Sequence, residues 1–420
     1  MRPTQTRSGQ ARQRSAAQAR RRRRPSAAVR RRRAFALTAL IVIFVGLIAV
    51  AASLGGSTST TNNAKGGSSS SSNSSTSTTH TTTPPPVVVS NLNQVSFVDR
   101  CPSCSTENFV TGTSTNGRTI GADIWYPSYG GTSPATGSGA SPLIVLAPGY
   151  DLSPLDYQPL INDWVRAGFV VAAAVFPDTN PSAVAAVEKV YPVPGTHSPE
   201  ADVANQPRDL GFLISQLATA DRHAKSGNLG FLHKLFNANE IGVAGQSDGG
   251  DTVAGLYFNS CCAADVSNPV GAVAILSGAE DSGWFTGSWF RSDHTPLLVA
   301  QGTNDACNSP PNAVTLYNGA PASLPKYFLE LRGANHLVAY TASGSSLDVV
   351  GRATTAFFDV YLHQGNATTT SLIDAGGSRH SSLTAAPSAP ALSAVPVNWS
   401  YNPGTSLDPC SIKFTGPPHG

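Results

Sequence analysis

The residue of this chain best suited to chemistry is a serine flanked by glycines. Residues 245–249 read GQSDG, which fits the pattern G-x-S-x-G, and they follow a short apolar run, residues 241–244. A helix-forming stretch comes next, so we expect Ser247 on a sharp turn between a strand and a helix. Glycines two residues before and after it let the two backbones approach without a Cβ clash. Because these letters also occur in ordinary turns, a serine nucleophile here requires a base, an acid and an oxyanion site elsewhere.

The base that this serine needs is predicted to be His336. A serine hydroxyl is a poor nucleophile until a base takes its proton, and histidine suits this task at neutral pH. The chain has nine histidines, and His336 follows a short apolar run, residues 327–331, that we expect to be a strand. A loop after the last parallel strand faces the serine turn across the carboxyl edge of the sheet. The alternative is a solvated loop histidine without a catalytic role.

The acid that orients the histidine is predicted to be Asp305. It follows the apolar run of residues 297–301 and so lies one strand before His336 on the same edge. Asp281, after the run of residues 272–276, is the competing candidate. The chain order Ser247, Asp305, His336 is the order of a hydrolase triad built on an α/β sheet.

Acyl transfer also requires backbone N–H groups directed at the developing oxyanion. One donor is expected to be the N–H of Asp248, the residue after the nucleophile. The second is expected from Tyr150, because residues 146–150 read LAPGY and follow an apolar run that predicts a strand. A Pro-Gly pair at this place is also compatible with a simple turn.

The elements that position these residues alternate along the chain. Apolar runs predict strands, and residues spaced by three and four predict helices. Strands are expected at residues 120–126, 143–147, 169–176, 241–246, 272–276, 297–301 and 327–331, and helices at residues 159–167, 208–217, 250–258 and 347–363. This alternation predicts an α/β fold with a mostly parallel central sheet covered by helices on both faces.

The N-terminal region predicts a membrane anchor. Residues 1–33 contain 13 arginines and no acidic residue, and residues 34–54 are uncharged and apolar. This length suffices for a transmembrane helix, because a bilayer core takes roughly 20 apolar residues. The flanking arginines predict a cytoplasmic N-terminus and an exported remainder. We favour an uncleaved signal anchor; cleavage near residues 49–55 would instead release a secreted protein.

Charge and composition divide the rest of the chain. Of 28 basic and 25 acidic residues, 15 and 25 remain beyond residue 33, a net charge of −10, so we expect no nucleic-acid partner. Low-complexity stretches bound a region long enough for one α/β domain. The expected divisions are a basic tail (1–33), the anchor (34–54), a Ser/Thr/Pro-rich linker (55–90), a catalytic domain (91–366) and an Ala/Pro/Ser-rich, loosely ordered tail (367–420, with residues 368–396 of lowest complexity).

Six cysteines lie beyond the apolar segment. An even count in an exported chain favours disulfides, although six cysteines allow 15 pairings. Cys101 and Cys104 form a C-x-x-C pair that also fits half of a zinc site or a redox motif. No second such pair completes a metal site in the sequence, so we expect neither a metal nor a cofactor.

Four segments together resemble a known group of enzymes. They are residues 147–150 (APGY), 245–250 (GQSDGG), 302–305 (GTND) and 326–336 (KYFLELRGANH). They are similar to the corresponding segments of cutinase-like bacterial polyester hydrolases and of the related platelet-activating-factor acetylhydrolase and chlorophyllase group. Residues 97–99 (FVD) and 124–127 (IWYP) resemble the opening strands of that group. The resemblance covers about residues 95–365 and implies an α/β-hydrolase fold with the triad and oxyanion donors named above.

Two departures from this group bear on the substrate. The turn of the group often reads Gly-His-Ser-Met-Gly, whereas this chain has Gln246 and Asp248 beside the serine. The polyester enzymes also carry a substrate-stacking tryptophan soon after the strand preceding the acid, where this chain has no tryptophan until Trp284. Trp284, Phe285 and Trp289 are candidates for an alternative wall of the site or for ordinary core packing.

The sequence therefore predicts a membrane-tethered, extracytoplasmic serine hydrolase that acts on ester or lipid-like carboxylic esters through an acyl-enzyme. An envelope acyltransferase with the same triad is the first alternative, since the triad does not determine whether water or another acceptor resolves the acyl group. A non-catalytic, envelope-anchored binding domain with a retained hydrolase fold is the second.

Overall fold

The computed structural model describes residues 88–89, 93–101, 105–111, 113–129, 134, 141–191, 199–266, 268–278, 284–290, 294–362 and 367–386. These residues all belong to one compact unit, which covers residues 82–420. The predicted basic tail and membrane anchor, residues 1–54, lie outside the described residues. Among the helices that are described, none is both long and apolar enough to cross a membrane.

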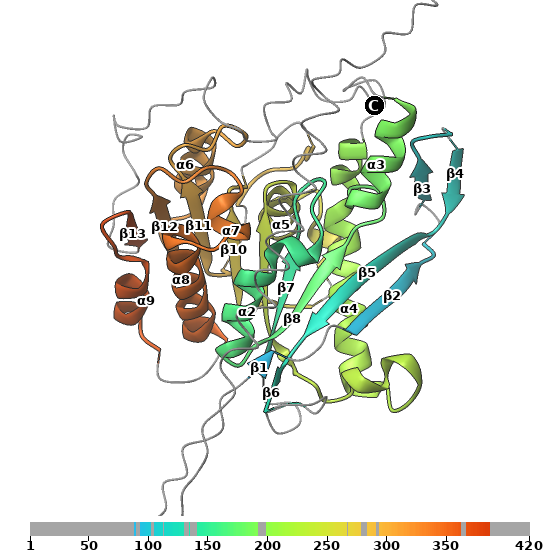
Figure 1. Cartoon of the computed structure of the whole chain (residues 1–420), viewed down its shortest axis with the longest axis horizontal. Coiled ribbons are helices and arrows are strands. Elements are labelled where there is room, and N and C mark those ends of the chain that lie inside the picture. The colour runs from blue at the N-terminus through green and yellow to red at the C-terminus, as the bar shows by residue number, and fades with distance from the viewer. Residues whose placement is uncertain are drawn as a thin grey trace, which may run out of the picture. The chain divides into compact units, whose positions relative to one another are not determined.

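A mixed sheet of nine strands, most of them parallel, forms the centre of the described fold (Figure 1). From one edge to the other the strands are β13 (Ser381–Ala386), β12 (Lys326–Leu331), β11 (Leu297–Gly302), β10 (Ala272–Leu276), β9 (Asn237–Gln246), β7 (Pro142–Ala147), β8 (Val170–Val175), β5 (Arg118–Trp125) and β2 (Asn93–Asp99). The six strands from β12 to β8 run parallel, and antiparallel strands flank them at both edges. Two small ribbons pair β1 (Val88–Val89) with β6 (Pro127–Ser128) and β3 (Ser105–Asn108) with β4 (Thr113–Asn116).

Helices cover both faces of this sheet, which confirms the predicted α/β class. On one face α4 (Gln206–His223), α5 (Asp248–Phe258) and α6 (Pro310–Gly319) contribute buried side chains to a first hydrophobic core. On the other face α2 (Gln158–Arg166), α7 (Val338–Thr341), α8 (Ser345–Tyr361) and α9 (Thr369–Gly376) contribute to a second core. A further helix, α3 (Pro181–Val190), follows β8 in the chain.

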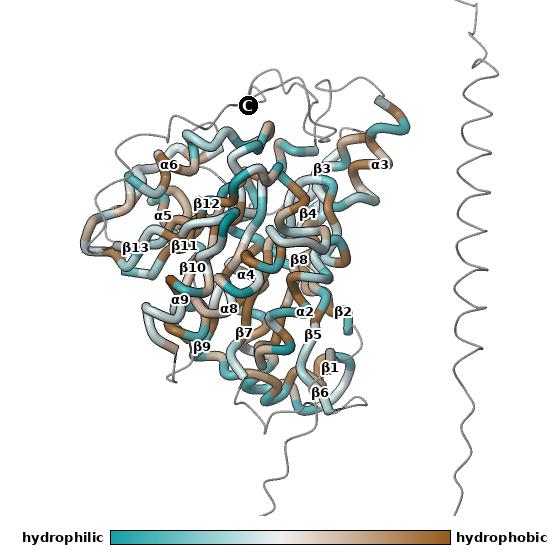
Figure 2. The backbone as a smooth tube through the Cα atoms, turned by 60° about the vertical axis from the view of Figure 1, so that its left-hand side comes forward, coloured by the Kyte–Doolittle hydropathy of each residue, from teal (hydrophilic) through white to brown (hydrophobic). Residues whose placement is uncertain are grey.

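The apolar character of the central strands follows from this double cover. Every residue of β7, β10 and β11 is buried, because neither face of these strands meets water. Successive residues point to opposite faces, so Leu143 of β7 belongs to the first core and Ile144 to the second. Figure 2 shows hydrophobic residues concentrated along these strands.

The amphipathic spacing predicted for residues 159–167 is present in α2. Leu160, Ile161 and Trp164 fall on one face of this helix and are fully buried. Gly168, just beyond the end of the helix, has a φ of 104°, a left-handed conformation that glycine adopts without steric strain. This turn directs the chain into β8, so the local sequence sets both the helix and its end.

The chain beyond residue 367 corrects one expectation. The composition of residues 368–396 predicts a loosely ordered tail, and this prediction is wrong for the first part, which forms α9 and β13. Thr368 caps α9, and Leu372 is fully buried in the second core. β13 pairs with all six residues of β12. Pairing at a sheet edge uses backbone N–H and C=O groups, so it does not require an apolar composition.

A buried ion cluster joins β5 to α4 and to the segment that leads into it. Arg118 is 2% exposed and forms hydrogen bonds of 2.6–3.0 Å with the carboxylates of Asp202 and Asp209. A third carboxylate, that of Asp178, lies 3.6 Å from the guanidinium. Burial raises the pKa of Asp209 to about 6, although hydrogen bonding to Arg118 opposes this shift. The cluster therefore holds several carboxylates around one cation.

Disulfides occur within this unit. Cys261 and Cys262, which are adjacent in sequence, are bonded to each other. Cys101 and Cys307 each take part in a disulfide as well. Cys307 lies on the loop after β11, two residues beyond Asp305, so this bond restrains a loop of the candidate site.

Candidate active site

The turn between β9 and α5 holds Ser247 in an unusual backbone conformation. Its φ is 56° and its ψ is −127°, a combination that is strained for a residue with a side chain. A Cβ on Gly245 would lie 2.1 Å from the carbonyl oxygen of Gly249. A Cβ on Gly249 would lie 2.0 Å from the carbonyl oxygen of Ala147. The close approach expected at this turn is therefore present, and it excludes any side chain at either glycine.

The structure brings Ser247, His336 and Asp305 together in one row. Ser247 Oγ lies 2.7 Å from His336 Nε2, and His336 Nδ1 lies 2.9 Å from Asp305 Oδ2. Because a carboxylate only accepts hydrogen bonds, Nδ1 carries the proton and Nε2 accepts from the serine hydroxyl. Asp305 is fully buried and His336 is 1% exposed. The competing acid, Asp281, lies outside the described residues.

The carboxylate of Asp305 is held by a set of donors. Gln301, the fifth residue of β11, donates from Nε2 to Asp305 Oδ2 at 2.9 Å. The backbone N–H groups of Cys307 and Asn308 donate to Oδ1 at 2.9 and 3.0 Å. These bonds stabilise the ionised carboxylate in a buried place and fix the oxygen that faces the histidine.

The loops that carry Asp305 and His336 are hydrogen-bonded to each other. Gly333 N–H donates to Thr303 Oγ1 at 2.8 Å, and Asn304 N–H donates to the Ala334 carbonyl oxygen at 2.9 Å. A Cβ on Gly302 would lie 2.4 Å from that same carbonyl oxygen. This packing fixes the separation between Asp305 and His336.

The loop after β7 lies against Ser247, as predicted for the loop that carries Tyr150. A Cβ on Gly149 would lie 2.9 Å from the Cβ of Ser247, so the backbone of this loop approaches the serine closely. Asp151 N–H donates to the Thr179 carbonyl oxygen at 3.0 Å, which holds the loop from the other side. On the serine side, Asp248 is the first residue of α5, and N–H groups of a first helical turn point out of the helix N-terminus. Tyr150 and Asp248 thus lie on the two segments that border Ser247.

Replacing Gly149 by alanine is expected to disrupt this approach. The new methyl group would lie 2.9 Å from both Ser247 Cβ and Gln246 Oε1, so the loop must move by several tenths of an ångström. We expect the rate of reaction of Ser247 with a fluorophosphonate to fall by up to about 100-fold, which is the cost of a displacement of about 1 Å in a catalytic site. Gly230→Ala is the matched control, because its methyl group would meet neighbours at an ordinary 3.6 Å. Equal labelling of both variants would contradict the proposed contact.

The surroundings of Tyr150 are negatively charged. Burial raises the pKa of the Tyr150 hydroxyl, and the negative charges of Glu200, Asp151 and Glu188 raise it further. Asp248, beside Ser247, contributes in the same direction. The tyrosine therefore stays neutral, and the acidic surroundings disfavour an anionic group on a bound molecule.

The aromatic residues that follow β10 pack against the fold. Phe285 is 2% exposed and forms a small cluster with Val203 and Cys262, against which Trp284 and Trp289 also pack. A Cβ on Gly255 of α5 would lie 2.9 Å from the Phe285 ring. Core packing, one of the two interpretations of these residues, therefore describes Phe285.

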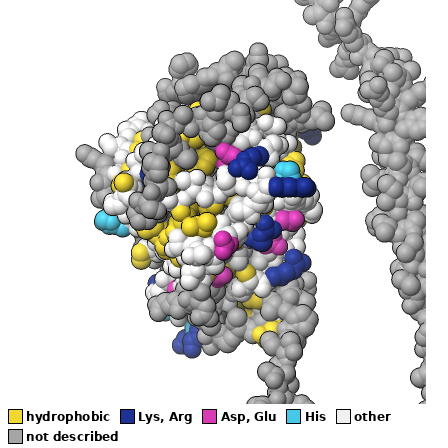
Figure 3. All heavy atoms as spheres, turned by 90° about the vertical axis from the view of Figure 1, so that its left-hand side faces the viewer, with side chains coloured by type: hydrophobic (Ala, Val, Ile, Leu, Met, Phe, Trp, Pro, Cys, Tyr) yellow, Lys and Arg dark blue, Asp and Glu magenta, His cyan; other side chains and the backbone are white. Residues whose placement is uncertain are grey.

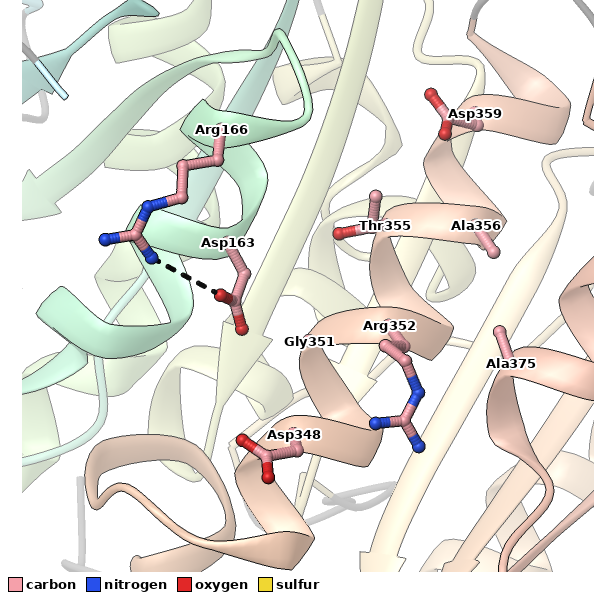
Figure 4. A pocket seen from close by; sticks show the side chains of 9 residues that line it. All are labelled: Asp163, Arg166, Asp348, Gly351, Arg352, Thr355, Ala356, Asp359 and Ala375. Atoms are coloured by element: carbon pink, nitrogen blue, oxygen red, sulfur yellow. Dashed lines mark ion pairs between the residues drawn. The ribbon is translucent and has the colours of Figure 1, made fainter. Parts of the chain in front are cut away.

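A groove of about 550 Å³ lies between α2 and α8, and no residue of the candidate triad lines it (Figure 4). Charged side chains border it: Asp163 and Arg166 come from α2, and Asp348 and Arg352 come from α8.

On the face at the β13 side of the sheet, the described acidic and basic side chains lie close to one another beside apolar patches (Figure 3). The described side chains of that face thus form no surface of a single charge.

Three contributors to the site escaped sequence analysis. Gln301 carries one signal, a polar residue at the end of an otherwise apolar strand. Tyr157, whose hydroxyl accepts from Gly149 N–H at 3.0 Å and donates to Gln246 Oε1 at 2.6 Å, carries none. Gln246 was noted as a departure from related turns, without a role.

No protein-family model matches the chain, and no curated protein is significantly similar to it. The functional interpretation therefore rests on the geometry of these residues.

Proposed function

We propose that this chain is a serine hydrolase of carboxylic esters with an α/β-hydrolase fold. The observation that carries the proposal is the row Ser247 Oγ, His336 Nε2 and Asp305 Oδ2, with contacts of 2.7 and 2.9 Å. The topology supports it, because the serine follows the central strand β9, and the acid and histidine follow β11 and β12 at the same edge. A strained turn at the serine is the further mark of such a nucleophile.

In the proposed mechanism Ser247 Oγ attacks the carbonyl carbon of the ester while His336 Nε2 takes its proton. The carbonyl oxygen becomes an oxyanion, which accepts hydrogen bonds from the N–H groups of Tyr150 and Asp248, each worth about 3–4 kcal/mol. Asp305 holds the imidazole ring and stabilises its charged form. The tetrahedral intermediate then expels the alcohol, which takes the proton from His336, and an acyl-serine remains.

Deacylation repeats these steps with an acceptor in place of the serine. His336 removes a proton from the acceptor, the acceptor oxygen attacks the acyl-serine, and Ser247 leaves with that proton. Water as the acceptor gives hydrolysis, which we propose. Tyr150 and Asp248 serve both halves of the reaction, because each half forms an oxyanion at the same place.

Turnover of uncharged p-nitrophenyl esters of graded acyl length tests the proposal. The full chain in mild detergent is expected to release nitrophenol and to be labelled once per chain by a fluorophosphonate. Adding a sugar or glycerol acceptor separates hydrolysis from acyl transfer, since transfer would yield a new ester. A chain that neither turns over these esters nor becomes labelled would refute the proposal and leave the non-catalytic alternative.

The acid of the triad is tested by replacing the two candidate aspartates separately. Asp305→Asn is expected to lower kcat about 10³- to 10⁴-fold, because an amide no longer holds the histidine in the required tautomer. Asp281→Asn is the control and is expected to stay within threefold of the unchanged chain. The reverse order of effects would assign the acid to Asp281.

We also propose that the hydrolase is tethered to the cell membrane with its catalytic domain outside the cytoplasm. This rests on the arginines of residues 1–33 and the apolar segment 34–54, which the sequence alone supplies. Protease treatment of intact cells tests the orientation, since an external domain is degraded and a cytoplasmic tail is protected. A released domain in the medium would indicate cleavage after the anchor.

A further inference from the structure

A chain of buried hydrogen bonds connects the loop after β7 to the loop that carries His336. Gly149 N–H donates to the hydroxyl oxygen of Tyr157 at 3.0 Å, and this hydroxyl donates to Gln246 Oε1 at 2.6 Å. Gln246 Nε2 then donates to the carbonyl oxygen of His336 at 3.1 Å. Gln246 itself directly precedes Ser247. These hydrogen bonds therefore connect all three segments that border Ser247.

The direction of each bond follows from its ends. The His336 carbonyl oxygen only accepts, so the amide nitrogen of Gln246 must face it and the amide oxygen must face Tyr157. The Gly149 N–H only donates, so it takes a lone pair of the Tyr157 oxygen and leaves the hydroxyl proton for Gln246. Tyr157 and Gln246 are both fully buried, so neither finds water as a substitute partner.

We propose that Gln246, oriented by Tyr157, is a positioning residue that fixes the oxyanion loop relative to the catalytic histidine. This inference rests on the proposed ester hydrolase function and adds a determinant of its geometry. Gln246 Oε1 fills the space beside Gly149, where a Cβ would lie 2.9 Å from it, and Nε2 lies 3.4 Å from His336 Nε2. The side-chain amide of Gln246 thus contacts both the loop at Gly149 and the ring of His336.

The physical role of this residue is to couple two distances. Transfer of the serine proton depends on the separation of Ser247 from His336, and oxyanion stabilisation depends on the separation of Ser247 from the loop at Gly149. These loops follow different strands, β12 and β7, with β9 beside β7. A rigid link through Gln246 holds both separations at their required values at the same time. The transition state of ester cleavage needs both at once, because the proton moves to His336 while the oxyanion forms.

The test uses Tyr157→Phe, Gln246→Met and the double variant in the full chain. Each single variant is expected to lower kcat for p-nitrophenyl butyrate about 10- to 100-fold, with KM within about twofold, because geometry rather than binding is lost. The rate of fluorophosphonate labelling is expected to fall in parallel. The double variant is expected to be no slower than the slower single variant, since both changes break the same chain.

Tyr327→Phe is the matched control. Its hydroxyl forms a hydrogen bond of 2.7 Å with Tyr361, and Tyr327 lies near the start of β12, away from the loop at its end. We expect a comparable loss of thermal stability from this variant and an unchanged kcat. The control thus separates loss of a buried tyrosine hydrogen bond from loss of the link.

The outcomes distinguish this inference from the proposed function. If the unchanged chain hydrolyses the ester and both single variants keep its kcat, the inference is wrong while the proposed function stands. If the losses of the two single variants multiply in the double variant, Tyr157 and Gln246 act independently and the coupling is also wrong. If the unchanged chain is inactive and unlabelled, the proposed function itself fails.

Discussion

Alanine at position 247 is expected to lower kcat for a short ester about 10⁵- to 10⁶-fold, as removal of a triad serine does in a chain that acts through an acyl-enzyme. Without Oγ there is no nucleophile for His336 to activate, although the oxyanion donors remain. Labelling by a fluorophosphonate is expected to be lost completely. Thermal stability is expected to change little, since the Ser247 side chain is only partly buried and the strained backbone remains.

Ser277→Ala is the control that this chain offers. Ser277 directly follows β10, the strand beside β9, and has a positive φ of 48°, as Ser247 has one of 56°. Unlike Ser247, it is fully buried. Its hydroxyl, however, lies 2.8 Å from the hydroxyl of Tyr340 rather than near a histidine. This variant is expected to remain labelled and active. Labelling that persists in Ser247→Ala would refute Ser247 as the nucleophile.

Methionine at position 118 is expected to lower the free energy of unfolding by about 3–5 kcal/mol. The guanidinium of Arg118 is the cation that compensates Asp202 and Asp209 inside the protein, and its removal leaves buried charges without their partner. Denaturation by urea, followed by circular dichroism, measures the loss. Arg208→Met is the matched control, because Arg208 is 41% exposed in its ion pair with Asp99 and such pairs contribute about 0–1 kcal/mol.

The same variant has an expected pH dependence. Asp209 has a pKa of about 6 in the folded chain against 3.8 ordinarily, so the folded chain binds this proton more tightly than the unfolded chain. Protonation of Asp209 therefore contributes to the free energy of unfolding in full below about pH 4, and this contribution is lost as the pH rises through 6. Removing Arg118 raises this pKa further, because an opposing charge is gone. The loss in Arg118→Met is therefore expected to be larger at pH 8 than at pH 5, and a loss independent of pH would contradict this account.

Local signals in the sequence predicted the α/β class and placed the strands that carry the site. Apolar runs without polar interruption, such as residues 297–300, have few alternatives to a doubly covered strand. The glycines around Ser247 were informative because they reported a steric requirement of the turn. The contact of Ser247 with His336 was a prediction from their order along the sheet, and the structure places the two side chains at hydrogen-bond distance.

Contacts between distant segments were beyond such reasoning. Arg118 and Asp209 are 91 residues apart, and the sequence around one of them gives no sign that the other is its ion-pair partner. Tyr157 has a role only because the loop at Gly149 and the amide of Gln246 converge on it. The strand β13 was missed for a related reason, since its sequence SSLTAA becomes a strand through the partner it finds at the edge of the sheet.

That late strand has a consequence for the order in which the chain is synthesised. β12 leads directly to the loop with His336, and its outer edge is covered by β13, while Arg332 N–H donates to the His380 carbonyl oxygen at 2.8 Å. Until residue 386 has left the ribosome, the strand that delivers the histidine presents open backbone groups to any other strand. Nascent or C-terminally truncated chains are thus exposed to strand exchange at the edge of the strand that leads to His336, and completion of β13 ends that exposure.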